Sequence, residues 1–578
     1  MMKKGLCMLL ISFSLISFIG CHHDATPLSA GETAKPNMGY SVTKKSDDGY
    51  EKEHNTKLKN PYEKLKPNLN PNVPNHLKPH SRLVMTDVED RTFFDYFAWQ
   101  TFVGLVWPAD STYRGVPNRT ITPEDFLNYN SSDPSNPNRV PVVWETFRTF
   151  DEAFPVSKKD TAATPEKWDA TKYERPFTLD LTSKGKGHEN LDEAFSSVLI
   201  DQNRQYVRYN LGLNKVMYEF IRENKWYLKE NLPKSPTPAT LPPLVDPSTQ
   251  KPITISQPQT NTVIKQTVNG NSIEIKSAWR IMILEEDLTK PWRKKDDLSK
   301  YFISKANVTD WNGTVKNDVL VGLVGLHVVV KTPQFVQGLW SSFEHVDNVK
   351  TKRSGVRPSF HNETDTIYKQ GFEYQPKRGA PLKKEEDRRP VGVSRTYKIP
   401  DTPVGHGKHL PDGLSTAALN TTFQRLLQGT VWENYQLVIT QWPTDPTTFY
   451  PKPDLYPRGP EPDSLSLPAA HQAWKRADEA AKKAYPRWSG LPLPQIGALN
   501  TTMETYFQNP NPPTEGLNKG IRQPIENTSC MGCHYGASDT DYSWGLKNRT
   551  FPQPFNQGRV NPKDQALLMD YIKTESKK

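Results

Sequence analysis

The sequence predicts an α+β protein, in which a large mixed N-terminal domain with many loops precedes a small, mainly helical C-terminal segment. Three observations lead to this fold class. Helix-like and strand-like hydrophobic patterns alternate along the middle of the chain. Of the 578 residues, 51 are proline and only 35% are hydrophobic, so loops and turns must be extensive. Near the C-terminus, two helix-like patterns flank the sequence Cys530-Met531-Gly532-Cys533-His534.

Residues 1–20 have the features of a secretory signal. Lys3 and Lys4 precede an apolar stretch that is short for a membrane span, and Gly20 is followed by Cys21. This arrangement resembles a bacterial lipoprotein signal, which implies cleavage before Cys21 and acylation of that cysteine. Several acyl chains make membrane anchoring stable. The alternatives are an ordinary cleaved signal with an incidental cysteine and an uncleaved anchor.

Residues 21–80 are predicted to form a disordered tether. They are rich in Lys, Asn, Pro, Ser and Glu, and they lack periodic apolar positions. The residue after Cys21 is His22 rather than aspartate. By resemblance to the enterobacterial sorting pattern, this favours the outer membrane, with the protein facing the periplasm.

Residues 81–490 are predicted to form the large α+β domain. An aromatic-rich helix is expected before Pro108, and a valine-rich interior strand contains His327. Asn269-Gly270 accepts the positive φ angles of a tight hairpin turn. The expected elements are helices at 93–107, 203–224, 414–427 and 469–485, strands at 142–147, 319–330 and 431–442, and a β-hairpin of 262–268 with 273–283.

The Cys530-to-His534 pattern is the one expected for covalent haem attachment. Cys530 and Cys533 can each form a thioether with a haem vinyl group, while His534 supplies an axial imidazole to the iron. A redox dithiol and half of a zinc site are the alternatives, but the sequence has no second C-x-x-C to complete a zinc tetrahedron. Export of the chain agrees with haem, so we expect one covalent haem c.

Residues 491–578, with expected helices at 500–507 and 562–574, resemble the small c-type cytochrome fold around this motif. The resemblance implies a cytochrome c-like haem-binding domain that transfers electrons. Other segments are similar to a group of large, mostly uncharacterised single-haem bacterial proteins, and this similarity transfers no activity. Those segments are 97–102, 143–146, 327–348 and 500–504.

The second axial ligand is not evident from the sequence. In small c-type cytochromes a methionine in the loop before the last helix fills this position, but residues 535–561 contain neither methionine nor histidine. The candidates for a distal ligand or pocket are Met503, Met569, His327 and His345. Met569 has the spacing of a core residue, and a histidine on an apolar strand is usually a hydrogen-bonded core residue.

Three functions remain open. The first is an electron-transfer lipoprotein with an unidentified redox partner protein. The second is a haem enzyme of peroxidase or oxygenase type with an open iron position, and the third is a haem-based binding or sensory module. The net charge is +10, or +8 without the leader, and no nucleic-acid-binding motif is present, so a nucleic-acid partner is not expected.

Overall fold

The computed structural model describes the chain between residues 67 and 551, with gaps. No helix in this described part is both long enough and apolar enough to cross a membrane. The described residues are 67–75, 77, 91–129, 139–157, 161–171, 173, 177–179, 197–233, 240–245, 251–252, 256–257, 262–264, 267–350, 356–362, 371–372, 374, 376, 381–395, 399–400, 415–442, 499–507, 530, 534, 537 and 540–551.

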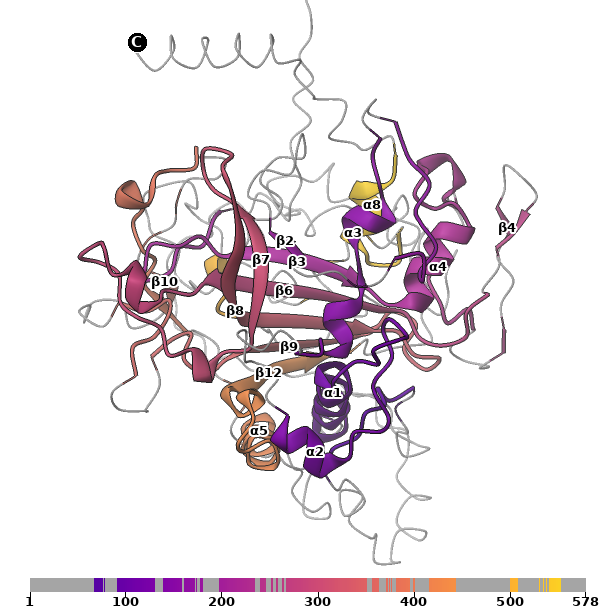
Figure 1. Cartoon of the computed structure of the whole chain (residues 1–578). Helices are drawn as coiled ribbons and strands as arrows, with labels where there is room; N and C mark the ends of the chain where they lie inside the picture. Colours follow the sequence, from indigo (N-terminus) through magenta and orange to yellow (C-terminus); the bar gives the residue numbers. More distant parts are fainter. Residues whose placement is uncertain are drawn as a thin grey trace, which may run out of the picture.

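An eight-stranded sheet, shown in Figure 1, organises the described residues. Its longest strand is the valine-rich β8 (Val315–Val330), which pairs antiparallel with three neighbours. One side of β8 pairs with β6, and the other side pairs first with β7 and then with β9. The remaining strands of this sheet are β1 (Arg148–Thr149), β2 (Phe177–Leu179), β3 (Arg208–Leu213), β6 (Ile273–Ile281), β7 (Ile303–Thr309), β9 (Leu339–His345) and β12 (Tyr435–Gln441).

The sheet is strongly curled. Register shifts interrupt the pairing of β6 with β8 and of β7 with β8, and such bulges bend a sheet. The edge strand β2 runs parallel to β7 and also contacts β3, which belongs to the opposite side of the sheet. The curl therefore brings two distant parts of the sheet together.

Helices α1 (Arg91–Val106) and α5 (Thr416–Leu426) cover one face of the sheet beside β9 and β12 (Figure 1). Trp99 is wholly buried there, with its ring 5.0 Å from that of Phe423 and 5.1 Å from that of Phe343. Its indole N–H donates to Oδ1 of Asn420 at 3.0 Å. Burial of an aromatic ring of this kind stabilises the fold by about 2–3 kcal/mol.

The opposite face of the sheet receives the C-terminal segments. Lys276 on β6 and Ser342 on β9 are both direct cross-strand partners of His327 on β8, so all three side chains point to this side. We call the side that carries Lys276, His327 and Ser342 the motif face. Gly325 lies on this face. A Cβ at position 325 would collide with Thr502 Oγ1, and glycine has none. The segment 499–507 can therefore approach β8 closely.

The prediction of a small, mainly helical cytochrome segment is wrong for the residues that the structure describes. These are mostly a curled mixed sheet with few helices, so the α+β class fits only loosely. Residues 500–507 form a turn and the 3₁₀ helix η10 (Thr505–Phe507), and α8 (Trp544–Arg549) is short. Asn500 donates to the Phe343 carbonyl at 2.8 Å, so this segment is built onto the sheet. The expected helices at 469–485 and 562–574 lie outside the described residues.

Three element predictions from long patterns are confirmed. The helix predicted at 93–107 is α1, and the interior strand that carries His327 is β8. The helix predicted at 414–427 is α5. The strand predicted at 431–442 begins later, because Val431–Asn434 forms the 3₁₀ helix η9 before β12.

Three other element predictions are wrong. The expected strand at 142–147 is the 3₁₀ helix η2 (Val143–Thr146), since Glu145 accepts the Val142 N–H at 3.0 Å and closes the turn. The expected helix at 203–224 is divided into β3 and α4 (Lys215–Glu223), which Asn214 caps. The expected hairpin does not form: β5 (Thr262–Val263) pairs with β4 (Ser256–Gln257), and β6 pairs with β3 and β8.

Part of the predicted tether packs onto the folded body. The side chain of Gln100 in α1 donates to the Asn68 carbonyl at 3.1 Å. Leu77 is buried, and Leu69 and Val73 pack against the main core. Residues 67–75 and Leu77 therefore belong to the folded body, and the rest of the predicted tether lies outside the described residues.

Candidate functional site

Cys530 and His534 lie together against the motif face. Both have helical backbone conformation, and both side chains lie beside Trp340 of β9. The backbone N–H of Cys530 donates to Oε1 of Gln441 at 2.7 Å, which ties the start of the motif to β12. Cys533 lies outside the described residues.

The imidazole of His534 has a defined orientation. Its Nδ1 is 2.6 Å from the Tyr542 carbonyl oxygen. A carbonyl only accepts, so Nδ1 must carry the proton and donate it, which leaves the lone pair on Nε2. The ring centroid of Trp340 is 4.4 Å from that of His534 and limits its rotation. The side chain is thus arranged as a metal-ligating histidine usually is.

Cys530 has an apolar environment. Its side chain packs with Trp340 and Tyr542 and beside Val329 on β8. Burial raises the pKa of the Cys530 thiol, and the nearby Glu504 carboxylate raises it further. A reactive dithiol needs a lowered thiol pKa, so the Cys530 thiol lacks the activation that is typical of a redox pair.

His327 occupies a charged part of the motif face. Its Nε2 lies 3.3 Å from Oε1 of Glu504, whose other carboxylate oxygen accepts the Asn500 N–H at 2.8 Å. Burial raises the pKa of Glu504, but His327 and Lys276 outweigh this effect and lower it overall. His327 and Glu504 therefore form an acid–base pair on the same face as the motif.

Two candidates for the distal ligand belong to the core. Nε2 of His345 lies 2.9 Å from the Lys300 carbonyl, and its Nδ1 accepts the Asp347 N–H at 3.1 Å. Both ring nitrogens of His345 are thus engaged, and its ring stacks on Tyr301 at 4.0 Å. Met503 is wholly buried in an apolar cluster. The structure therefore shows both side chains packed in the core.

The sequence stretch from His327 to Asn348 is divided between the two faces. His327 and Trp340 lie on the motif face, whereas Phe343 belongs to the main core. Lys331, beyond the end of β8, forms a buried ion pair with Asp541. The remaining candidates, Met569 and the lipidation residue Cys21, lie outside the described residues.

These residues fit a covalent haem. The motif supplies an oriented imidazole and an adjacent thiol beside an apolar wall made by Val329 and Trp340. The described residues contain no cluster of three or more His, Cys, Asp or Glu suited to a metal ion. A c-type haem needs only one protein ligand from its motif, so the donor set present matches that chemistry.

Sequence reasoning did not identify Gln441, Glu504 and Asp541 as parts of this site. Each reaches the motif face through contacts between residues far apart in the chain, as in the pairing of Lys331 with Asp541 over 210 positions. No local pattern marks such residues. Glu504 does lie in a segment that the resemblance singled out, which was the one available signal.

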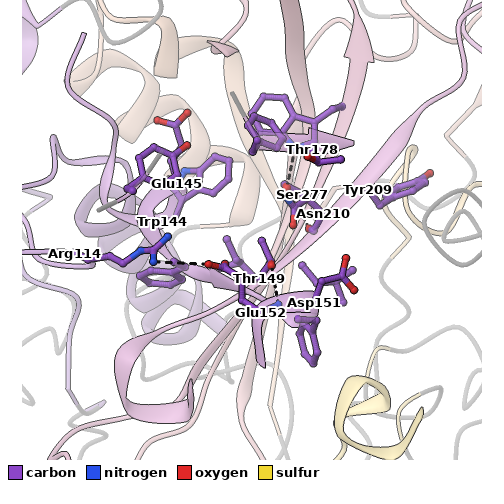
Figure 2. A pocket seen from close by; sticks show the side chains of 18 of the residues that line it. Arg114, Trp144, Glu145, Thr149, Asp151, Glu152, Thr178, Tyr209, Asn210 and Ser277 are labelled. Atoms are coloured by element: carbon purple, nitrogen blue, oxygen red, sulfur yellow. Dashed lines mark hydrogen bonds and ion pairs between the residues drawn. The ribbon is translucent and has the colours of Figure 1, made fainter. Parts of the chain in front are cut away.

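A cavity of about 470 Å³ opens on the side of the sheet opposite to the motif face. Figure 2 shows Trp144 and Glu145 on one side and Thr178, Asn210 and Ser277 on the other. The carboxylates of its lining are paired with arginines: Glu145 with Arg139, Glu152 with Arg148 and Asp151 with Arg549. Ile275 and Ser277 line this cavity, while Lys276 between them points to the motif face, so the two sites lie back to back.

Comparison of the chain with protein families, with curated proteins and with solved structures gave no match.

Proposed function

We propose that the protein is an exported, lipid-anchored c-type cytochrome that carries one covalent haem and transfers electrons. Cys530 and Cys533 form the thioethers, and His534 is the axial ligand. The observation that carries the proposal is the hydrogen bond from His534 Nδ1 to the Tyr542 carbonyl, with the half-buried Cys530 beside the same Trp340 ring. A bound haem c supplies a one-electron iron couple at this position.

The residues around the motif have distinct roles in this proposal. The Tyr542 carbonyl holds the proton on Nδ1 of His534, so the lone pair that would bind the iron is on Nε2. Val329 and Trp340 exclude water from one side of the site. Exclusion of water reduces the reorganisation that accompanies a change of charge, which suits electron transfer.

Optical and EPR spectra of the purified ferric and ferrous protein test the proposal, with and without carbon monoxide or peroxide. An electron carrier is expected to give low-spin iron that does not bind these ligands. High-spin iron that binds them would count against a pure electron carrier and in favour of an enzyme or a sensory module.

A haem enzyme of peroxidase or oxygenase type is the second candidate, because His327 and Glu504 form an acid–base pair on the motif face. A histidine paired with a carboxylate can hold and move a proton beside a reacting ligand. The same histidine is also the described candidate best placed to become a second axial ligand, since His345 and Met503 belong to the core.

We therefore expect His327→Gln to change the optical and EPR spectra or the binding of carbon monoxide. Met503→Leu is the matched control, because it conserves volume in an apolar cluster and costs less than about 1.5 kcal/mol. Its spectra should equal those of the wild type. Unchanged spectra in the His327→Gln protein, or a change confined to Met503→Leu, would contradict a role for His327 at the iron.

The anchor is tested by Cys21→Ser. This variant is expected to be exported and then released from membranes, because serine cannot receive the thioether-linked lipid. Cell fractionation measures the change, and Cys7→Ser, which alters a leader cysteine away from the cleavage site, should leave the protein membrane-bound. Retention of the Cys21→Ser protein in the membrane fraction would refute acylation at that residue. We propose anchoring to the outer membrane on its periplasmic side.

A further inference from the structure

The hydrogen-bond acceptor of His534 lies in a turn with an unusual backbone. Asp541 and Tyr542 have φ angles of 58° and 63°, a left-handed conformation that residues other than glycine seldom adopt. The turn is closed by the Tyr542 N–H, which donates to the Ala537 carbonyl at 2.9 Å. The position of the Tyr542 carbonyl therefore depends on whatever holds these two residues in place.

A buried ion pair holds the turn. The ammonium group of Lys331 pairs with Oδ2 of Asp541, and the side chains are only 5% and 0% exposed, respectively. The same carboxylate oxygen accepts the Leu241 N–H at 2.6 Å. Lys331 directly follows β8, and its own N–H donates to the Ser272 carbonyl at 3.0 Å, so the cation is fixed to the sheet.

We propose that Lys331 and Asp541 form a buried clamp that positions the Tyr542 carbonyl and, through it, the iron-ligating imidazole of His534. This inference rests on the proposed haem. The connection runs from β8 to Lys331, then to Asp541 and the adjacent Tyr542, and finally to Nδ1 of His534. Lys331 and Asp541 are positioning residues, since they act on the ligand through the backbone of the turn.

The clamp connects the large domain to the segment that carries the motif. Lys331 is contributed by the sheet, 210 positions before Asp541. A hydrogen bond to the second nitrogen of a ligating histidine changes its basicity, and the loss of such a bond typically weakens metal binding by about 10- to 100-fold. The sheet would thereby set the strength of the iron–histidine bond and, with it, the reduction potential.

The test uses the full-length exported protein and the variants Asp541→Asn and Lys331→Met. In the double variant Lys331→Met/Asp541→Asn no charge is left buried without a partner, so this protein is expected to fold even if the single variants do not. Two readouts are taken. One is the near-infrared charge-transfer band of the ferric haem in magnetic circular dichroism, whose energy falls when an axial ligand donates more weakly, and the other is the reduction potential.

Asp201→Asn is the matched control. Asp201 forms a buried ion pair with Arg280 at 3.0 Å, with side chains 0% and 3% exposed, but it has no part in the turn at Tyr542. Its loss is expected to lower the unfolding temperature without moving the band or the potential. A purely structural role for Lys331 and Asp541 would give the same result as this control.

In the clamp variants we expect the band to move to lower energy, together with a shifted potential. Circular dichroism shows which clamp variants fold. If these variants lose covalent haem while Asp201→Asn retains it, the result supports the clamp. An unshifted band and potential in a haem-loaded double variant would overturn it. A wild-type protein without covalent haem would instead refute the proposed function, so the two failures are distinguishable.

Discussion

Replacement of both Cys530 and Cys533 by serine is expected to yield an exported protein with no covalent haem. The hydroxyl of serine does not add to a haem vinyl group as a thiol does, so neither thioether can form. His534 alone would hold a haem only by coordination, which denaturation breaks. Haem-dependent staining after denaturing electrophoresis measures the change, and we expect complete loss of the signal.

Two controls make this result specific to the motif. Cys7→Ser alters a cysteine of the leader and should leave the staining at the wild-type level. Cys530→Ser alone should retain a weaker attachment through Cys533. Persistent covalent haem in the double-serine protein would contradict the assignment of these two residues.

The second large effect is expected for Glu344→Ala, in stability rather than in haem content. Glu344 is wholly buried on β9 and accepts the Thr501 N–H at 3.0 Å and the Thr501 hydroxyl at 2.7 Å. It also pairs with Arg395 and accepts from Gln436 at 3.2 Å. Removal of the carboxylate leaves Arg395, whose side chain is 14% exposed, without its ion pair and the Thr501 donors without an acceptor, which costs about 3–5 kcal/mol of folding free energy.

Denaturant unfolding measures this loss as a lower midpoint. Glu285→Ala is the matched control, because Glu285 pairs with Lys295 at 3.3 Å on the surface, where an ion pair contributes about 0–1 kcal/mol. Glu344→Gln should fall between the two, since it retains an acceptor but loses the charge. A midpoint for Glu344→Ala equal to that of Glu285→Ala would show that the Glu344 network does not hold residues 499–507 to the sheet.

Elements with long, uniform patterns could be predicted from the sequence. The 16 residues of α1 are rich in aromatic side chains that bury well in a helix, and the valines of β8 suit an interior strand. Shorter patterns failed because tertiary contacts decided their conformation. Residues 142–147 have β-branched side chains, yet the buried Glu145 pairs with Arg139 and bonds to the Val142 N–H, which favours a 3₁₀ turn.

The candidate site was predictable only where its residues are close in sequence. The spacing of Cys530, Cys533 and His534 is a local signal, and the structure places Cys530 and His534 together beside Trp340. The distal candidates could not be ranked, since a histidine on a strand looks the same on either face. His345 and His327 differ in their partners: backbone atoms of Lys300 and Asp347 in the first case, and Glu504 in the second.

The central claim is that Cys530 and Cys533 hold one haem covalently. Acidified organic solvent extracts non-covalent haem, and the alkaline pyridine spectrum of the remaining protein then reports the state of the haem vinyl groups. We predict one haem per chain in the protein fraction, with both vinyl groups saturated. Haem that moves into the solvent, or a haem-free protein with a disulfide between Cys530 and Cys533, would contradict the claim.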